Sequence, residues 1–406
     1  FDCPDYNTGC NILGRKTDGT SEGGQSWYDM SLAISPVDEN IIYAGGIALW
    51  ESGDGGQSWN VEASSGSGSY AYMHVDQHAL EYNPINNALY AGNDGGFYKY
   101  INHLTDWVDI SDGLEISQFY RLGLSKSNSE ILVSGAQDNG TERLSSSSWD
   151  AIRGSDGMEC IIDPYDPDII YSSSQYGGLK ITYDAGNNWS NFKPVSYDGA
   201  WVTPYKMHPL NNNMVVAGYN QVYRTITGGA SWDSISYVPF SGALRTIALA
   251  PSDQSVIYAA TYSKLYVTFD GGNNWANIKP GLPNSTISDV TVSANNPYWV
   301  WVTFSDYTAG NKVYESTDGG SSWGNISGSN LPNLPVNCIV YQDLTNDDLY
   351  IGTDIGVYHK DNTMSDWQPF KTGLPNVQVD ELEIHYGSSK LRAATFGRGI
   401  WESDLQ

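Results

Sequence analysis

The chain has 406 residues, and its 46 acidic and 20 basic side chains give a formal net charge of −26. This charge makes nucleic acid and anionic membrane surfaces poor partners, and it suits a secreted or surface-displayed protein. No stretch is apolar for long enough to cross a bilayer as a helix, so membrane insertion is not expected. Abundant Gly, Tyr and Trp with only 16% charged residues are typical of short strands and many turns.

Residues 1–27 contain mainly turn formers and one short strand candidate at 11–15. Cys3 and Cys10 are close enough to form a disulfide that pins this segment in an oxidising compartment. From Trp27 onward, short apolar runs alternate with turns, and the first predicted sheet has strands at 30–34, 41–45 and 47–51.

Later repeats follow the same order, and no helix of any length is expected. Each has a second strand that is apolar and rich in β-branched or aromatic residues, as expected for a strand covered on both faces. These second strands are predicted at 88–92, 131–135, 169–172, 214–218, 256–260, 298–303 and 349–352. Cys160 and Cys338 lie in apolar runs and are predicted to be buried free thiols.

The last repeat has only three predicted strands, at 379–385, 390–395 and 399–402. A closed ring can complete such a sheet with a strand from the other terminus, and 11–15 is the candidate. Eight full repeats and this composite predict about nine sheets, within a range of seven to ten. The sequence therefore predicts an N-terminal segment, 1–27, followed by one large ring over 28–406.

One turn motif, Ser/Thr-x-Asp-x-Gly-x-x-Trp, returns along the chain. In Thr268–Trp275 the hydroxyl and the carboxylate of Asp270 can accept hydrogen bonds from the amides of the turn. Gly272 supplies a backbone angle that other residues disfavour. The carboxylates of the full copies, predicted to be structural, are Asp54, Asp184, Asp270 and Asp318. A fifth copy has Thr227 in place of the carboxylate.

This motif resembles the Asp-box, or BNR repeat, of sialidases, sortilin-type (VPS10) receptors and xyloglucanase-like glycosidases. The resemblance implies an all-β fold, a β-propeller of four-stranded antiparallel blades, with the boxes on the outer edge. Sortilin-type rings have ten blades, whereas xyloglucanase-like enzymes pair two rings of seven. In either case, ligands are expected at the mouth of the central channel.

The densest group of candidate site residues is His74-Val75-Asp76-Gln77-His78. Alternate residues of an extended strand share one face, so His74, Asp76 and His78 are expected to point the same way. Two imidazoles around a carboxylate suit a metal site or an acid–base pair. Tyr70 and Tyr72 would add aromatic surface for a ligand. A purely structural role for these polar residues remains an open alternative.

Other polar loops are expected at the same mouth. They contain Asp94, Gln137, Asp138, Asp156, Asp354 and Arg398. Clustered side-chain oxygens suit calcium, and paired carboxylates suit glycoside hydrolysis. Each of these Asp residues taken alone is more often a turn former, because Asx-Gly pairs are common in hairpins.

The order of these segments resembles that of secreted bacterial proteins described as glycosidase-like or sortilin-like. The resemblance implies a shared mouth at His74, Asp76, His78, Asp94, Asp138 and Asp156. Sialidases combine three arginines with an Arg-Ile-Pro segment, and this chain contains no such tripeptide. Sialidase activity is therefore disfavoured.

The sequence favours a secreted or cell-surface recognition or adhesion module that binds a glycan or protein partner. It is expected to require no cofactor, with calcium as the cation that its loops suit. The alternative is a xyloglucanase-like glycoside hydrolase that uses Asp76, Asp94, Asp138 or Asp156, supported by His74 and His78. Because the chain begins at Phe1, it is expected to be a mature or excised piece of a longer chain or surface assembly.

Overall fold

The computed structural model describes residues 10–66, 68–102, 106–236, 240 and 242–406. Nine sheets, antiparallel except for the parallel pairing of one short strand in the first, and one 3-10 turn, Gln175–Gly177, make up the regular structure of these residues. The predicted repetition of four-stranded sheets is confirmed. Within the same residues, no helix has the length and hydrophobicity needed to span a bilayer.

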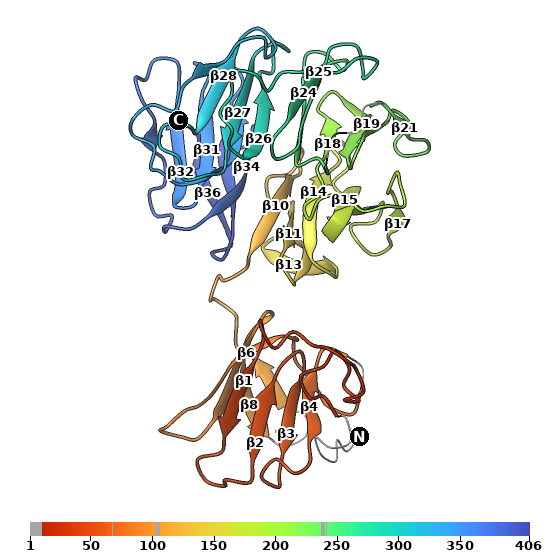
Figure 1. The fold of residues 1–406 in the computed structure, drawn as a ribbon, viewed down its shortest axis with the longest axis vertical. Helices are drawn as coiled ribbons and strands as arrows, with labels where there is room; N and C mark the ends of the chain where they lie inside the picture. The colour runs from red at the N-terminus through yellow and green to blue at the C-terminus, as the bar shows by residue number, and fades with distance from the viewer. Residues whose placement is uncertain (1–9, 67, 103–105, 237–239, 241) are drawn as a thin grey trace. The chain divides into compact units, whose positions relative to one another are not determined.

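The chain forms two compact units, residues 1–116 and 117–406 (Figure 1). This division corrects the single ring over 28–406 that the sequence predicts. The boundary segment around Ile116 has the same turn-rich composition as the loops between the other sheets. The regular spacing of strands and turns in the sequence therefore continues across the boundary between the two units and does not mark it.

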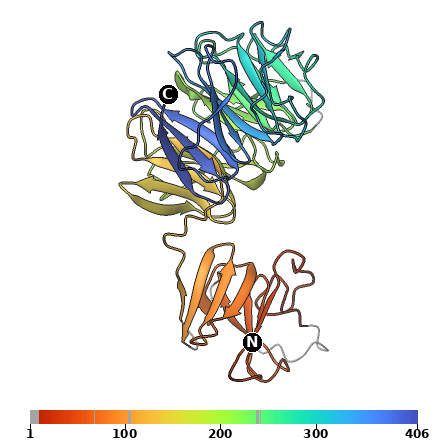
Figure 2. The ribbon, with the colours of Figure 1, turned by 90° about the vertical axis from the view of Figure 1, so that its left-hand side faces the viewer.

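The first unit contains two sheets packed face to face (Figure 2). Tyr43 and Ala63 of the first sheet and Leu80 and Ala91 of the second are buried in the core between them. The strands are β1 (Ser31–Ile34), β2 (Ile42–Gly45), β3 (Leu49–Ser52), β4 (Asn60–Ser64) and the parallel β5 (Ala71–Tyr72), then β6 (Gln77–Tyr82), β7 (Leu89–Asn93), β8 (Gly96–Asn102) and β9 (Asp106–Asp109).

The opposite face of the first sheet is covered only in part. Trp50 of β3 is fully buried there, in a cluster that includes Cys10 and Ile12 of the N-terminal segment. Leu32 and Ile34 of β1 are 63% and 54% exposed. An apolar strip on β1 is therefore open to solvent.

The second unit contains seven sheets among its described residues. The first four are β10 (Phe119–Leu124), β11 (Leu132–Ala136), β12 (Gly140–Ser145), β13 (Ser148–Arg153); β14 (Gly157–Ile162), β15 (Ile170–Ser174), β16 (Gly178–Thr182), β17 (Ser190–Asn191); β18 (Tyr205–His208), β19 (Asn211–Gly218), β20 (Val222–Thr225), β21 (Asp233–Ser234); and β22 (Thr246–Leu249), β23 (Ile257–Ala260), β24 (Leu265–Thr268), β25 (Ala276–Asn277). The last three are β26 (Ile287–Val292), β27 (Val300–Phe304), β28 (Val313–Ser316), β29 (Gly324–Asn325); β30 (Val336–Tyr341), β31 (Leu349–Thr353), β32 (Gly356–Lys360), β33 (Gln368–Pro369); and β34 (Val379–His385), β35 (Lys390–Thr395), β36 (Ile400–Asp404).

The seven sheets close into a ring through their first strands. Each of β10, β14, β18, β22, β26 and β30 packs against the first strand of the next sheet, and β34 packs against β10. At this closing seam the amide of Leu122 donates to Glu381 (2.5 Å), and Gln118 forms an isolated β-bridge with Phe396. The seam thus joins sheets through side chains and one bridge.

The expected closing strand at 11–15 does not complete the last sheet. Gly14 forms only an isolated bridge with Gly24, and the sheet of β34, β35 and β36 has three strands. Lateral packing of β34 on β10 closes the ring without a shared strand. Of the cysteines, Cys10 is disulfide-bonded and Cys160 and Cys338 are free and buried, as predicted, while Cys3 lies outside the described residues.

The Asp-box turns connect the third and fourth strands of their sheets. In one of them Thr268 donates to Asp270 (2.9 Å), and the amide of Gly272 donates back to Thr268 (2.8 Å). The indole of Trp275 then donates to the carbonyl of Ile235 in the preceding sheet (2.8 Å). The indoles of Trp189 and Trp323 likewise donate to the carbonyls of Ile152 (3.0 Å) and Ile278 (2.9 Å) in the sheets that precede theirs.

Candidate functional site

Two loops of the second unit bring sequence-predicted site residues together. Gln137 and Asp138 form the turn between β11 and β12, in which Asp138 has a positive φ of 58°. Asp156 lies in the loop just before β14. Both loops open at the end of the ring where the chain enters the first strands, the predicted channel mouth.

The side-chain amide of Gln137 connects the two carboxylates. Its Nε2 donates to Asp138 Oδ1 (2.8 Å) and to Asp156 Oδ1 (2.7 Å). The backbone amide of Asp138 also donates to Asp156 Oδ1 (2.9 Å). Burial, followed by the charge of Asp138 and a hydrogen bond with it, raises the pKa of Asp156. Asp156 is therefore protonated more readily than an exposed aspartate.

Aromatic side chains extend this polar cluster. The Tyr120 hydroxyl donates to Gln137 Oε1 (2.5 Å) and accepts from the Trp201 indole (3.1 Å). Trp201 meets the ring of Tyr176 edge to face, with centroids 5.2 Å apart. Tyr176 is 46% exposed, so an aromatic surface continues from the half-buried cluster to solvent. Sequence reasoning missed Tyr120 and Trp201, although Trp201 stands outside the Asp-box spacing and could have been singled out.

Arg398 and Asp354 stand at the same end of neighbouring sheets. The Arg398 side chain is exposed, and its guanidinium donates to the carbonyl of Gly397 (2.7 Å). Asp354 accepts a hydrogen bond from the Asn337 amide (3.0 Å). These hydrogen bonds of Arg398 and Asp354 do not involve the Gln137 cluster.

A cavity of about 640 Å³ occupies the channel of the ring, lined by the first strands of its sheets. Most of its charged side chains come from these first strands. Lys206 contacts Glu159 (2.9 Å) and Glu381 (3.3 Å), and Arg121 contacts Glu159 (3.4 Å). Burial raises the pKa of Glu381 to about 8 and that of Glu383 to about 7. The sequence does carry a signal for this cavity, because charged residues interrupt apolar strand runs there. That signal was not used in the sequence-based prediction.

The predicted site of the first unit is arranged differently from the expectation. Strand β6 begins only at Gln77, and Asp76 has a φ of 67°. An extended strand cannot pass through that conformation, so the expected common face of His74, Asp76 and His78 is not formed. His78 contacts Asp94 (2.7 Å), whereas Asp76 accepts from Gln25 (2.6 Å).

The remaining predictions for this unit have separate locations. His74 Nδ1 lies 3.2 Å from the carbonyl of Val75. Tyr72 is 66% exposed on the short strand β5, and Tyr70 is half-buried just before it. Among the described residues, no three His, Cys, Asp or Glu side chains are placed to hold a metal ion together. The structure therefore does not gather His74, Asp76 and His78 into a metal site.

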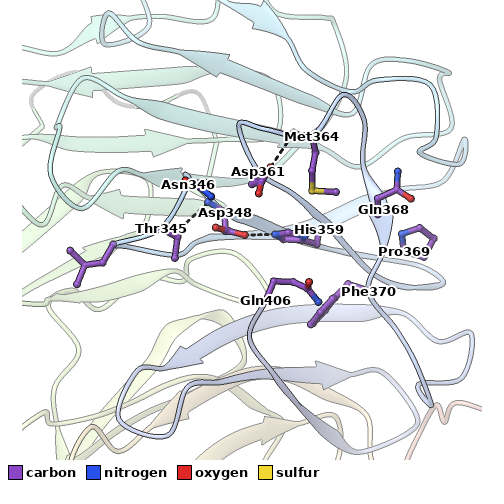
Figure 3. A pocket seen from close by; sticks show the side chains of 11 residues that line it. Thr345, Asn346, Asp348, His359, Asp361, Met364, Gln368, Pro369, Phe370 and Gln406 are labelled. Atoms are coloured by element: carbon purple, nitrogen blue, oxygen red, sulfur yellow. Dashed lines mark hydrogen bonds and ion pairs between the residues drawn. The ribbon is translucent and has the colours of Figure 1, made fainter.

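A second cavity, of about 800 Å³, lies beside β31, β32 and β33 (Figure 3). Inside it, His359 Nε2 lies 2.5 Å from Asp348 Oδ1, and both residues are buried. The ring of Tyr350 packs on His359, and its hydroxyl accepts from the amide of Gln406 (3.0 Å). These contacts hold the last described residue against the sheet, so we assign this cavity a structural role.

No protein-family model and no curated protein matches this sequence. Among solved structures, the chain is similar to the GH74 xyloglucanase of Xanthomonas campestris, with a TM-score of 0.58 and 17% identity over 92% of this chain. It spans 59% of that enzyme's length. It is also similar to YCF48 from Cyanidioschyzon merolae, with a TM-score of 0.55 and 12% identity, covering 70% of this chain and 94% of that one. At these identities the likeness establishes the β-propeller fold alone.

Proposed function

We propose that this protein is an extracellular or cell-surface recognition module that binds a glycan at the channel mouth of its seven-sheet ring. The observation that carries the proposal is the single amide of Gln137, which connects Asp138, Asp156 and Tyr120. A preformed polar cluster beside an aromatic surface is the usual make-up of a small-ligand site.

The chemistry of this mouth suits sugar hydroxyls. Carboxylate oxygens accept hydrogen bonds from vicinal hydroxyls, and the exposed Tyr176 beside Trp201 offers an aromatic face for the apolar side of a sugar ring. The cavity below adds further charged groups within the channel. A polypeptide that inserts a side chain into the mouth is the other ligand class, and the experiment below distinguishes the two.

Two properties support an extracellular location. Cys10 is disulfide-bonded, and disulfides persist mainly in oxidising compartments. The net charge of −26 favours solubility and disfavours binding to nucleic acid. The proposed partner is therefore a glycan of the cell exterior, bound without a required cofactor.

The second candidate is a glycoside hydrolase, favoured by the fold shared with a GH74 xyloglucanase. Glycosidase carboxylates stand roughly 5 to 9.5 Å apart, with the substrate or a water between them. Asp138 and Asp156 instead share one amide donor and a mutual hydrogen bond. This arrangement leaves no room for the reacting bond between them, so we rank binding above hydrolysis.

A glycan array and a polysaccharide-hydrolysis screen on the same preparation, with and without chelator, test the proposal. We expect binding without turnover, reduced at least tenfold by Trp201→Ala and by Asp156→Asn. Tyr183→Ala changes an exposed aromatic residue in the Asp-box turn between β16 and β17, and this matched control should bind normally. Turnover that Asp138→Asn abolishes would establish the hydrolase instead. Binding unaffected by both mouth variants would refute the assigned site.

A further inference from the structure

One carboxylate of the first unit is buried without adequate hydrogen bonding. Asp29, two residues before β1, is fully buried, and its Oδ1 has no hydrogen-bond partner. Its Oδ2 accepts only a long bond from Gln25 Nε2 (3.3 Å). Buried carboxylate oxygens are normally paired or bound to a cation, because desolvation without compensation is costly.

A second carboxylate converges on the same amide. Gln25 Nε2 also donates to Asp76 Oδ1 (2.6 Å), so the side chain of Gln25 bridges Asp29 and Asp76. Asp76 is held at its positive φ partly by a bond from its own amide to the carbonyl of Ile47 (3.0 Å). Such sparsely populated backbone conformations cluster at ligand sites, where the surroundings enforce them.

The side-chain amide of Gln25 can face the two carboxylates with its nitrogen or with its oxygen, depending on whether a cation is bound. When no cation is present, its NH₂ group faces the carboxylates. Rotation of the amide by half a turn would exchange NH₂ for Oε1 and present three oxygen ligands to one point. The nitrogen and oxygen of such an amide are assigned from the surrounding hydrogen bonds, so a cation would reverse the assignment.

We propose that Asp29, Asp76 and Gln25 form a calcium site in the first unit. Two carboxylates and an amide oxygen, completed by water or carbonyl oxygens, are the hard ligands that Ca²⁺ takes in irregular geometry. These three side chains include no imidazole or thiolate, the ligands that predominate in zinc sites. Mg²⁺ demands a stricter octahedron than these three side chains offer.

The site would join two segments far apart in the sequence. Asp29 precedes the first strand of one sheet, and Asp76 precedes the first strand of the other. A bound cation would neutralise the buried Asp29 and the half-buried Asp76, and it would connect the entry points of the two sheets. The calcium site lies in the first unit and the glycan site in the second, so the loss of one site would leave the other intact.

Terbium luminescence tests the site, because Tb³⁺ occupies calcium sites and can be excited through nearby aromatic rings. Trp27 and Tyr28 directly precede Asp29, and they would act as the antenna. On the full chain stripped of metal, we expect saturable Tb³⁺ luminescence that Ca²⁺ displaces and an equal concentration of Mg²⁺ does not. Calcium should also raise the first unit's melting temperature.

Three variants make the test specific. Asp29→Asn should abolish the Ca²⁺-displaceable signal, and Gln25→Glu should bind Ca²⁺ roughly tenfold more tightly, because it adds a third carboxylate. Asp54→Asn, a box carboxylate of the same unit held by Ser52 and Ser58, is the control and should leave the signal unchanged. Circular dichroism checks that each variant folds.

The proposal is overturned if Asp29→Asn retains the displaceable signal, or if Ca²⁺ fails to displace Tb³⁺ from the wild type. If Asp29→Asn does not fold, Gln25→Glu decides the matter: unchanged or weaker calcium affinity refutes the site, and tighter binding supports it.

Discussion

Leu32 and Ile247 occupy equivalent positions in two sheets of this protein, yet one side chain is 63% exposed and the other 2%. Leu32 pairs with Ala44 across its sheet, and Ile247 pairs with Ala259 in the same register. Ile247 is buried in a cluster with Met214 and Val216 of the preceding sheet. The difference in burial therefore reflects the neighbouring sheet and not the local sequence.

Alanine substitutions at these two positions should have very different effects. Ile247→Ala leaves a cavity between two sheets and is expected to lower the free energy of unfolding by about 2–5 kcal/mol. Leu32→Ala removes an exposed side chain and should change it by no more than about 0.5 kcal/mol. Urea unfolding followed by tryptophan fluorescence, fitted as two transitions, measures both. Equal losses would contradict the burial described for β1.

The ring should lose stability as the pH rises through the neutral range. Burial raises the pKa of Glu381 to about 8 and of Glu383 to about 7, from an ordinary value of 4.5. The folded ring then binds more protons than the unfolded chain between pH 4.5 and 8, so its free energy of unfolding falls across that window. Melting temperatures measured from pH 5 to 9 should decline.

Glu381→Gln should flatten this decline, because the glutamine remains neutral while still accepting a bond from Lys206 or Leu122. The exposed Glu130→Gln is the matched control and should keep the wild-type profile. A decline of the same slope in Glu381→Gln would show that other titrating groups cause the loss of stability at higher pH.

The box glycine Gly272 should tolerate alanine less well than Gly310, which lies in the loop between β27 and β28. Gly272 has a φ of +99°, and an added Cβ would lie 2.5 Å from the carbonyl oxygen of Ile235. Gly310 has a φ of +70° with nothing within 4 Å of the added atom. We expect Gly310→Ala to cost about 1 kcal/mol from backbone strain, and Gly272→Ala more than about 2 kcal/mol. Thermal unfolding compares them, and equal costs would count against the close contact.

Thr227→Asp should stabilise the ring by completing its incomplete box. Thr227 already accepts from the amide of Ser231 (3.1 Å), as Asp318 accepts from Ser322 (2.9 Å) in a full box. Hydrogen bonds from Ser322, and then from Ser316, lower the pKa of Asp318 to about 2. A gain in melting temperature at pH 7 should therefore disappear as the pH falls below about 4, from the ordinary Asp pKa of 3.8 towards 2. A gain that persists at pH 2 would exclude this mechanism.

The repeated turn made the fold predictable, because box hydroxyls, carboxylates and glycines at fixed spacing determine a local hairpin. The same local origin explains the limit of the prediction. Whether β1 has another sheet beside it, as β22 has, depends on long-range packing that the motif does not encode. The regular spacing of strands and turns therefore predicted about nine sheets, but it did not reveal that the sheets divide into two units after Ile116.

The candidate site was predictable where turns position it. Gln137, Asp138 and Asp156 meet because both loops follow from strand boundaries that the sequence marks with Asx-Gly pairs. His74 and Asp76 do not share a face, because the backbone of Asp76 turns through a positive φ that an alternating polar pattern does not reveal. Asp29 gave no sequence signal, because its burial depends on packing that the sequence pattern does not show.

The seam between β34 and β10 has a mechanical consequence. Neighbouring sheets elsewhere in the ring are connected by a continuous backbone, whereas these two are the first and last of the second unit and are connected only by non-covalent contacts such as the bridge between Gln118 and Phe396. Under tension or on heating, we expect the ring to open first at this seam. The amides of β36 would then exchange with deuterium before those of the opposite sheets.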